Sequence, residues 1–215
     1  MNKKRIGQII VACFVLAMGI SFIDFGKNLP DHGEVIGEFI ADNLEEGTTY
    51  RPIVVKRIDE SMLLSQPAVN EAYATIIDSI GNQLELLSGQ YISLDFQNQL
   101  QAATDFSSQL NLQNLVDYMP LDAALKRVAK KPGHLDKKQM AALYQEETRM
   151  HTAINELNAA LGQYNLSVFS LDLGEESNPI YWHRFELSNE LGSSEHISVF
   201  ELENESGEVL SFKEI

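Results

Sequence analysis

The sequence is poor in cysteine and tryptophan, since its 215 residues contain one of each. The single cysteine, Cys13, lies inside an apolar run near the N-terminus. Residues 14–215 therefore offer no thiol for a disulfide, a cysteine metal cage or nucleophilic catalysis. This excludes a disulfide scaffold and a thiol enzyme. A cysteine-free domain also tolerates an oxidising compartment, because nothing in it can mis-pair.

Positive charge is scarce as well. The chain has 16 Lys and Arg against 31 Asp and Glu, a net charge of −15, and without residues 1–25 the balance is 13 against 30. Such a domain repels nucleic-acid phosphates and anionic lipid headgroups, so we expect no nucleic-acid partner. A protein with a basic surface is the natural electrostatic complement. An acidic surface kept for solubility is the simpler alternative.

Recognisable catalytic motifs are also missing. The sequence contains no G-x-S-x-G, S-x-x-K, H-E-x-x-H, phosphate-binding loop, G-x-G-x-x-G or EF-hand pattern. Their absence favours a binding protein over an enzyme, and we expect no cofactor. Dispersed catalytic sites leave no such motif, so individual residues still have to be weighed.

A targeting pattern is present at the N-terminus. Lys3, Lys4 and Arg5 precede an apolar run over residues 6–23, which at 1.5 Å per residue spans close to the ~30 Å bilayer core. Basic residues precede the run and mostly acidic ones follow it, so the positive-inside rule places the N-terminus in the cytoplasm. We predict a single-pass signal anchor over 1–25 in a bacterial inner membrane. A linker over 26–33 and a soluble, acidic, periplasmic domain over 34–215 follow.

Two other interpretations of the N-terminus stay open. Ala17-Met18-Gly19 supplies a small-x-small site at which a signal peptide could be cleaved. Ile10-Val11-Ala12-Cys13 resembles a bacterial lipobox, in which Cys13 would be lipidated. All three interpretations place the acidic domain outside the cytoplasm.

The hydrophobic periodicity predicts an α+β fold. An amphipathic helix is expected over 34–47, a strand over 48–58, and helices from 65 to 164. Period-two segments at 165–173, 180–188, 196–203 and 209–215 predict four strands. We therefore expect a helical segment packed on one face of a C-terminal antiparallel β-meander, which the strand at 48–58 joins.

The helical region divides at recognisable signals. Pro67 marks the start of a long helix, and Asp95 is the expected cap of the next. A short basic helix is expected between Pro120 and Pro132, and Asp136 should cap the longest helix. Six cations gather over residues 126–138 beside a single acid, and the simplest interpretation is a solvated helix end.

Glu147 is the first candidate functional residue. It occupies a position between Leu143 and Met150 where the periodicity favours an apolar side chain, and His151 follows one turn later. A carboxylate–imidazole pair of this kind can act as a general base or bind a metal. The simpler interpretation, which we favour, is that both residues reach solvent.

The second candidate region is the strand around His183. Tyr181, Trp182, His183 and Arg184 could line a ligand pocket in which Arg184 binds an anion, and His196 on the next strand could approach His183. A histidine that shares a strand face with Phe185 is more often a hydrogen-bonded core residue, and we favour that interpretation.

Together these features predict a membrane-anchored extracytoplasmic module that binds a protein with a basic surface. An inhibitor or immunity-type protein is one form of this function. The first alternative is a metal-dependent or acid/base enzyme that uses Glu147 with His151 or His183 with His196. The second alternative is a ligand-sensing envelope domain.

Overall fold

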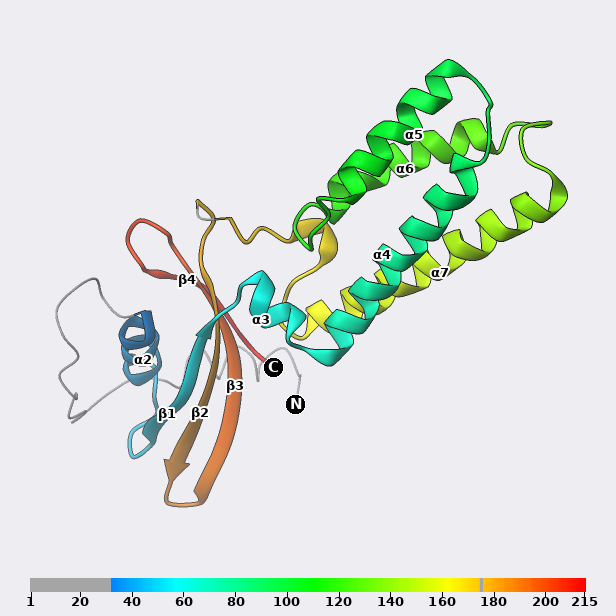
Figure 1. Ribbon diagram of the computed structural model, residues 1–215. Helices are drawn as coiled ribbons and strands as arrows, with labels where there is room; N and C mark the ends of the chain where they lie inside the picture. The colour runs from blue at the N-terminus through cyan, green and yellow to red at the C-terminus, as the bar shows by residue number, and fades with distance from the viewer. Residues whose placement is uncertain (1–31, 175) are drawn as a thin grey trace. The chain divides into compact units, whose positions relative to one another are not determined.

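The computed structural model describes residues 32–174 and 176–215, which form two compact units (Figure 1). The sheet unit contains residues 32–58 and 174–215, and the helical unit contains residues 59–173. The helical unit is therefore inserted in the chain between the first and second strands. The predicted anchor over 1–25, with Cys13 and the Ala17–Gly19 site, lies outside the described residues.

The sheet unit holds a four-stranded antiparallel sheet in the order β1-β2-β3-β4. Its strands are β1 (Thr49–Arg57), β2 (Ile180–Asn189), β3 (Gly192–Leu202) and β4 (Val209–Glu214). The predicted meander is confirmed, and so is the pairing of the early strand with it. His183 lies opposite Ser198, so these two residues share one face of the sheet.

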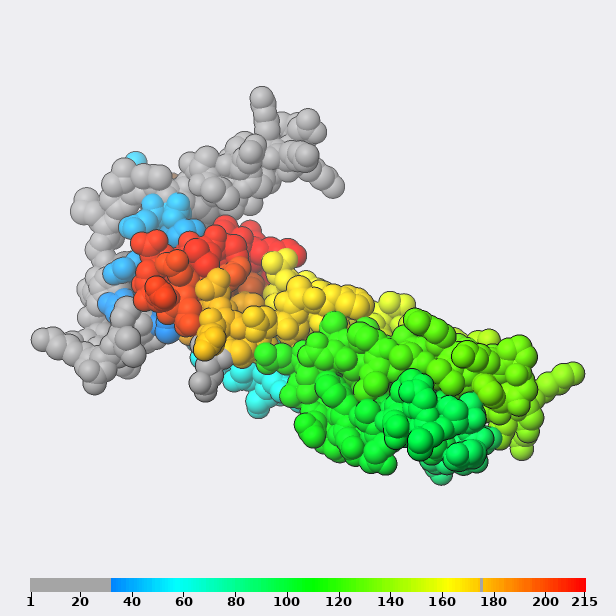
Figure 2. Space-filling view, turned by 90° about the horizontal axis from the view of Figure 1, so that it is seen from above, coloured from blue at the N-terminus to red at the C-terminus, as the bar shows by residue number. Residues whose placement is uncertain are grey.

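Helix α2 (His32–Asp42) covers part of that face. Ile36 and Ile40 are buried against Phe200 and its neighbours in the core of this unit, and Phe39 meets Phe200 edge-on with ring centroids 6.0 Å apart. The views in Figures 1 and 2 place α2 beside β4, in agreement with the tilted contact between Phe39 and Phe212. The helix begins two residues inside the predicted linker.

The helical unit is built from five helices and one 3-10 turn. Their bounds are α3 (Glu60–Leu64), α4 (Pro67–Ser88), α5 (Leu94–Ser107), α6 (Leu115–Ala129), α7 (Lys137–Gly162) and η1 (Val168–Ser170). Helix α4 packs along α7, and α5 packs against α6. Their apolar stripes are buried against one another, for example at Ile76, Phe96 and Leu157. Helix α2 packs on the sheet, and α4–α7 share a core of their own. Packing of the helical segment from 65 to 164 on the meander stays a prediction.

Several predicted boundaries are confirmed and others are wrong. Pro67 occupies the first turn of α4, and Asp136 caps α7 in a capping box with Gln139. Ser93, and not Asp95, caps α5. Helix α6 begins at Leu115 and contains Pro120, because burial of the preceding turn outweighs the backbone hydrogen bond that proline cannot make.

The predicted strand over 165–173 is wrong. Val168–Ser170 forms a 3-10 turn, and the backbone N–H of Val168 donates to the side chain of Asn158 on α7 at 2.8 Å. Leu166, Val168 and Leu171 are buried, so an irregular segment that packs on helices produced the alternating pattern. Among residues 32–174 and 176–215, no helix has both the length and the apolar character needed to cross a bilayer.

Candidate functional site

His183 is a structural residue at the centre of the sheet. Its side chain is fully buried, its Nδ1 lies 2.8 Å from the carbonyl oxygen of Val54, and its Nε2 lies 2.7 Å from the hydroxyl of Tyr50. The neutral tautomer with hydrogen on Nδ1 satisfies both bonds, since Nδ1 then donates to Val54 and Nε2 accepts from Tyr50. Burial lowers the pKa of His183 and raises that of Tyr50. The two hydrogen bonds of His183 therefore hold β1 on β2 next to the shift in strand register between Pro52 and Val54.

The residues from Tyr181 to Arg184 do not line one cavity. Successive side chains of a strand point to opposite faces, so Tyr181 and His183 lie on the α2 side while Trp182 and Arg184 lie on the other. Tyr181 stacks on His32 with ring centroids 5.1 Å apart, and Arg184 pairs with Glu195 at 2.9 Å. Arg184 is thus paired with a carboxylate, and it does not share a pocket with His183.

A groove lies on the α2 side of the sheet, beyond the end of α2, and has a volume of about 480 Å³. Its apolar lining comes mainly from Leu44, Phe185, Leu187 and Phe212. Its polar lining includes Glu45, Ser194, His196, Ser198 and Glu214. Leu191, at the β2–β3 turn, lies at the groove and is 97% exposed. An apolar surface with a few convergent polar groups is typical of a binding site.

A hydrogen-bonded chain of three side chains runs along this groove. His196 Nδ1 lies 2.6 Å from Glu214 Oε1, and His196 Nε2 lies 2.7 Å from Ser194 Oγ. The ring of Phe185 lies between the two histidines of the sheet, with centroids 5.0 Å from His183 and 5.6 Å from His196. The ring of Phe185 therefore separates His196 from His183, and the two imidazoles do not meet directly. Sequence reasoning missed Ser194 and Glu214, although the alternation of Ser194, His196 and Ser198 on β3 was a usable signal.

The charged residues that line the groove are acidic. The strand register places Arg51, Lys56, Arg184 and Lys213 on the face of Trp182, where Glu186, Glu195 and Glu201 also lie, and it places Arg57 opposite Tyr181 on the groove side. No lysine or arginine is among the described residues that line the groove, whereas Glu45 and Glu214 are. Helix α2 also ends at this side without a basic residue in its last turn, so its negative dipole end adds to the carboxylates. The groove is consequently anionic.

Ser198 is the most unusual polar group of the groove. It is 1% exposed, and its hydroxyl has no hydrogen-bond partner among the described residues. A buried hydroxyl without a partner costs about 1–3 kcal/mol, so a group that donates to it or accepts from it would stabilise the protein. Ser198 lies directly opposite Glu214 on β4.

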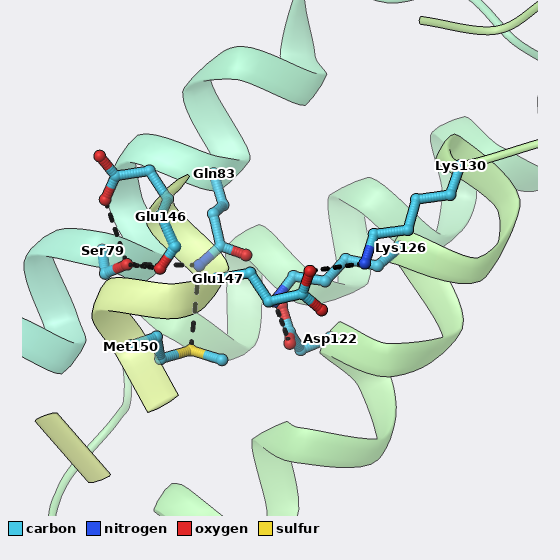
Figure 3. Close-up of polar contacts among 8 residues, drawn as sticks. All are labelled: Ser79, Gln83, Asp122, Lys126, Lys130, Glu146, Glu147 and Met150. Atoms are coloured by element: carbon cyan, nitrogen blue, oxygen red, sulfur yellow. Dashed lines mark hydrogen bonds and ion pairs between the residues drawn. The ribbon is translucent and has the colours of Figure 1, made fainter. Parts of the chain in front are cut away.

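In the helical unit, Glu147 has a different partner from the candidate His151. Glu147 accepts a hydrogen bond from Lys130, the C-cap residue of α6, at 2.5 Å, with its side chain 23% exposed (Figure 3). His151 lies at the surface. Lys130 also lies over the ring of Tyr144, 4.6 Å from its centroid. Glu147 thus joins α6 to α7, and the geometry gives no sign that it orients His151.

A second, more buried ion pair lies next to it (Figure 3). Lys126 Nζ is 2.6 Å from Asp122 Oδ2, and the two residues are 4% and 7% exposed. Burial raises the pKa of Asp122, and the Lys126 ammonium opposes that shift. Nearby, Ser79 donates to the backbone carbonyl of Glu146 at 2.6 Å. These contacts join α4, α6 and α7 in an interhelical polar network that stabilises the unit.

The described residues include no group of three or more His, Cys, Asp or Glu side chains that could hold a metal ion. No protein-family model matches the chain, and the comparisons with curated proteins and with solved structures find no match either.

Proposed function

We propose that the protein is a membrane-anchored extracytoplasmic module that binds a protein with a basic surface through the groove of the sheet unit. The observation that carries this proposal is the acidic lining of the groove. The described lining of the groove includes Glu45 and Glu214 and no lysine or arginine. Such a surface attracts cationic partners and repels anionic ones.

The proposed location follows from the apolar run over residues 6–23 and the cations before it. An anchor in a bacterial inner membrane would hold the acidic domain in the periplasm. Inhibition of a basic enzyme, as in an immunity-type protein, is a specific form of this function, since an acidic surface that covers a basic one needs no chemistry of its own.

Site-specific photo-crosslinking in the native envelope tests this proposal. A crosslinking residue at position 191, beside the groove, should capture one protein with a basic surface. The same residue at Tyr91, which is 82% exposed in the helical unit, is the matched control and should not capture that protein. The captured protein is then purified and titrated with the full chain at low and high salt, where weaker binding at high salt is expected.

Two paired variants make the test specific. Glu45→Gln with Glu214→Gln removes two charges at the groove, and Glu205→Gln with Glu208→Gln removes two from the exposed β3–β4 turn of the same unit. The groove variant should weaken binding by more than about 10-fold, which corresponds to ~1.4 kcal/mol. Equal weakening by both variants would show that only net charge matters, and this would contradict a role for the groove.

A second candidate, an acid/base enzyme centred on His196, is favoured by the chain from Ser194 through His196 to Glu214. A nucleophile, a base and an orienting carboxylate occur in this order in serine hydrolases. It ranks second because Ser194 is exposed, and because the buried hydroxyl of Ser198 is four residues away, about 13 Å along the strand. At that distance the Ser198 hydroxyl could not stabilise an oxyanion formed at Ser194. The test is hydrolysis of an activated ester by the full chain. Activity that the Ser194→Ala substitution abolishes would establish the enzyme instead.

A further inference from the structure

Two independent features meet at one end of the groove. Ser198 on β3 and Glu214 on β4 lie directly opposite one another, and the buried Ser198 hydroxyl has no partner among the described residues. Glu214 is held from the other side, because its Oε1 bonds to His196 at 2.6 Å. A carboxylate in a fixed position thus stands next to an unused hydroxyl.

These groups match one kind of ligand. An ammonium or guanidinium group has several donors and no acceptor, so it can donate to the Glu214 carboxylate and to the Ser198 oxygen together. Hydrogen bonds from a cation to a carboxylate are among the stronger ones in proteins. The absence of lysine and arginine among the described lining residues leaves the carboxylate available to such a donor.

The rest of the groove suits the remainder of a long cationic side chain. Leu44, Leu187 and Phe212 provide an apolar surface on which an aliphatic stem can pack. Leu191, almost fully exposed at the turn, offers a contact for an apolar neighbour of that side chain. The combination favours an apolar–cationic–apolar sequence over a run of charges.

We infer that the groove holds one lysine or arginine side chain of the partner, with the cationic group bound between Glu214 and Ser198 and the stem on Leu187 and Phe212. The inference rests on the proposed function and names the group that this site recognises. His196 acts here as a positioning residue, because it fixes the Glu214 carboxylate.

Short capped peptides test the inference without knowledge of the partner. The probes are Ac-Ala-Leu-Lys-Leu-Ala-NH2, the arginine analogue, and an analogue with uncharged norleucine at the central position. Each is titrated into the full ¹⁵N-labelled chain in a neutral detergent, and amide shifts are followed by NMR. The lysine or arginine peptide should shift the amides of groove residues, and the norleucine peptide should bind at least about 10-fold more weakly.

Two variants separate recognition from folding. Glu214→Gln should weaken binding of the cationic peptide by about 10-fold. Ser198→Ala should weaken it by about 3-fold to 10-fold while the stability of the unliganded protein stays the same or rises, because the substitution removes a buried unpaired hydroxyl. A purely structural role for Ser198 predicts the opposite pattern. Glu205→Gln with Glu208→Gln should leave peptide binding unchanged.

Other outcomes overturn the inference. Equal binding of the norleucine and lysine peptides would show an apolar groove without a cation site. Concentration-dependent self-association that competes with the peptide would assign the groove to a second copy of this chain, through its cationic residues at 127–138. If binding of the purified basic partner depends on the groove carboxylates but neither cationic peptide binds, the inference fails while the proposed function stands. If a cationic peptide binds but the groove substitutions leave the affinity for the partner unchanged, the proposed function fails.

Discussion

The buried pair of Asp122 and Lys126 allows a quantitative prediction about the helical unit. Replacing Lys126 with methionine keeps the volume of the side chain but leaves the Asp122 carboxylate without its cation. The two residues are 7% and 4% exposed, so little water can replace the lost ion pair. Removal of one partner of a buried pair typically costs 3–5 kcal/mol, and we expect Lys126→Met to lose about 3 kcal/mol of unfolding free energy at pH 7.

The loss should shrink as the pH falls. Burial already raises the pKa of Asp122, and without Lys126 only the weaker effect of His151 opposes the shift. The folded variant then binds a proton more readily than the unfolded chain, so its stability increases toward low pH by up to about 1.4 kcal/mol per pH unit. The double variant Asp122→Leu with Lys126→Met buries no charge and should be about as stable as the natural protein or more so.

Urea unfolding of the full chain in neutral detergent measures these values for each unit separately. Circular dichroism at 222 nm mainly follows the helical unit, whereas fluorescence of Trp182, the single tryptophan, reports the sheet unit. The fluorescence midpoint should not change and serves as an internal control. A loss below about 1 kcal/mol for Lys126→Met at pH 7 would refute the reasoning, because it would show that the pair behaves like an exposed one.

Two further substitutions and one pH effect follow from the same structure. Gly81→Ala should stabilise the helical unit by about 0.5–1 kcal/mol in the same urea assay, since Gly81 lies in the interior of α4 and nothing within 4 Å would meet an added Cβ; a destabilised variant would contradict this. Gly192→Ala should destabilise the sheet unit by about 1–3 kcal/mol, as judged by Trp182 fluorescence, because Gly192 has φ +136°, and an unchanged midpoint would be inconsistent with that conformation. Because burial lowers the pKa of His183, the unfolded chain takes up a proton that the folded protein excludes. The sheet unit should therefore lose stability as the pH drops below about 6.5, and His183→Asn should reduce that slope; equal slopes would disprove the assignment.

The sheet could be predicted from the sequence because its strands carry their own pattern. The alternation of His183, Phe185 and Leu187, and that of Ser198, Phe200 and Leu202, predicted that these residues share one face, and the pairing of β2 with β3 confirms it. Asp136 similarly marks the start of α7 by a local hydrogen bond to Gln139. Signals of this kind depend on neighbouring residues and can be read without a tertiary structure.

The errors arose where long-range packing decides the outcome. Pro120 suggested a helix start, but burial of Leu115 and Tyr118 extends α6 across it. The alternation over 165–173 suggested a strand, although the segment packs on helices. That the apolar stripes of α4–α7 are buried against each other depends on which apolar faces meet, and periodicity does not encode this.

The candidate site was only partly visible in the sequence for the same reason. His196 was singled out, but its partners differ from those expected. Ser194 is a near neighbour on β3, whereas Glu214 comes from β4, and only the pairing of the strands brings the carboxylate to the imidazole. Glu147 was likewise identified as an unusual acid on α7, yet its partner Lys130 is the C-cap residue of another helix.

The most direct test of the central claim is the affinity of the full chain for its crosslinked basic partner, measured across a salt titration for three proteins. These are the natural sequence, Glu45→Gln with Glu214→Gln, and Glu205→Gln with Glu208→Gln. Our account predicts that the groove variant binds at least about 10-fold more weakly at low salt and has a shallower salt dependence, while the turn variant resembles the natural protein. Identical affinities for all three, or a partner whose binding is insensitive to salt, would contradict it.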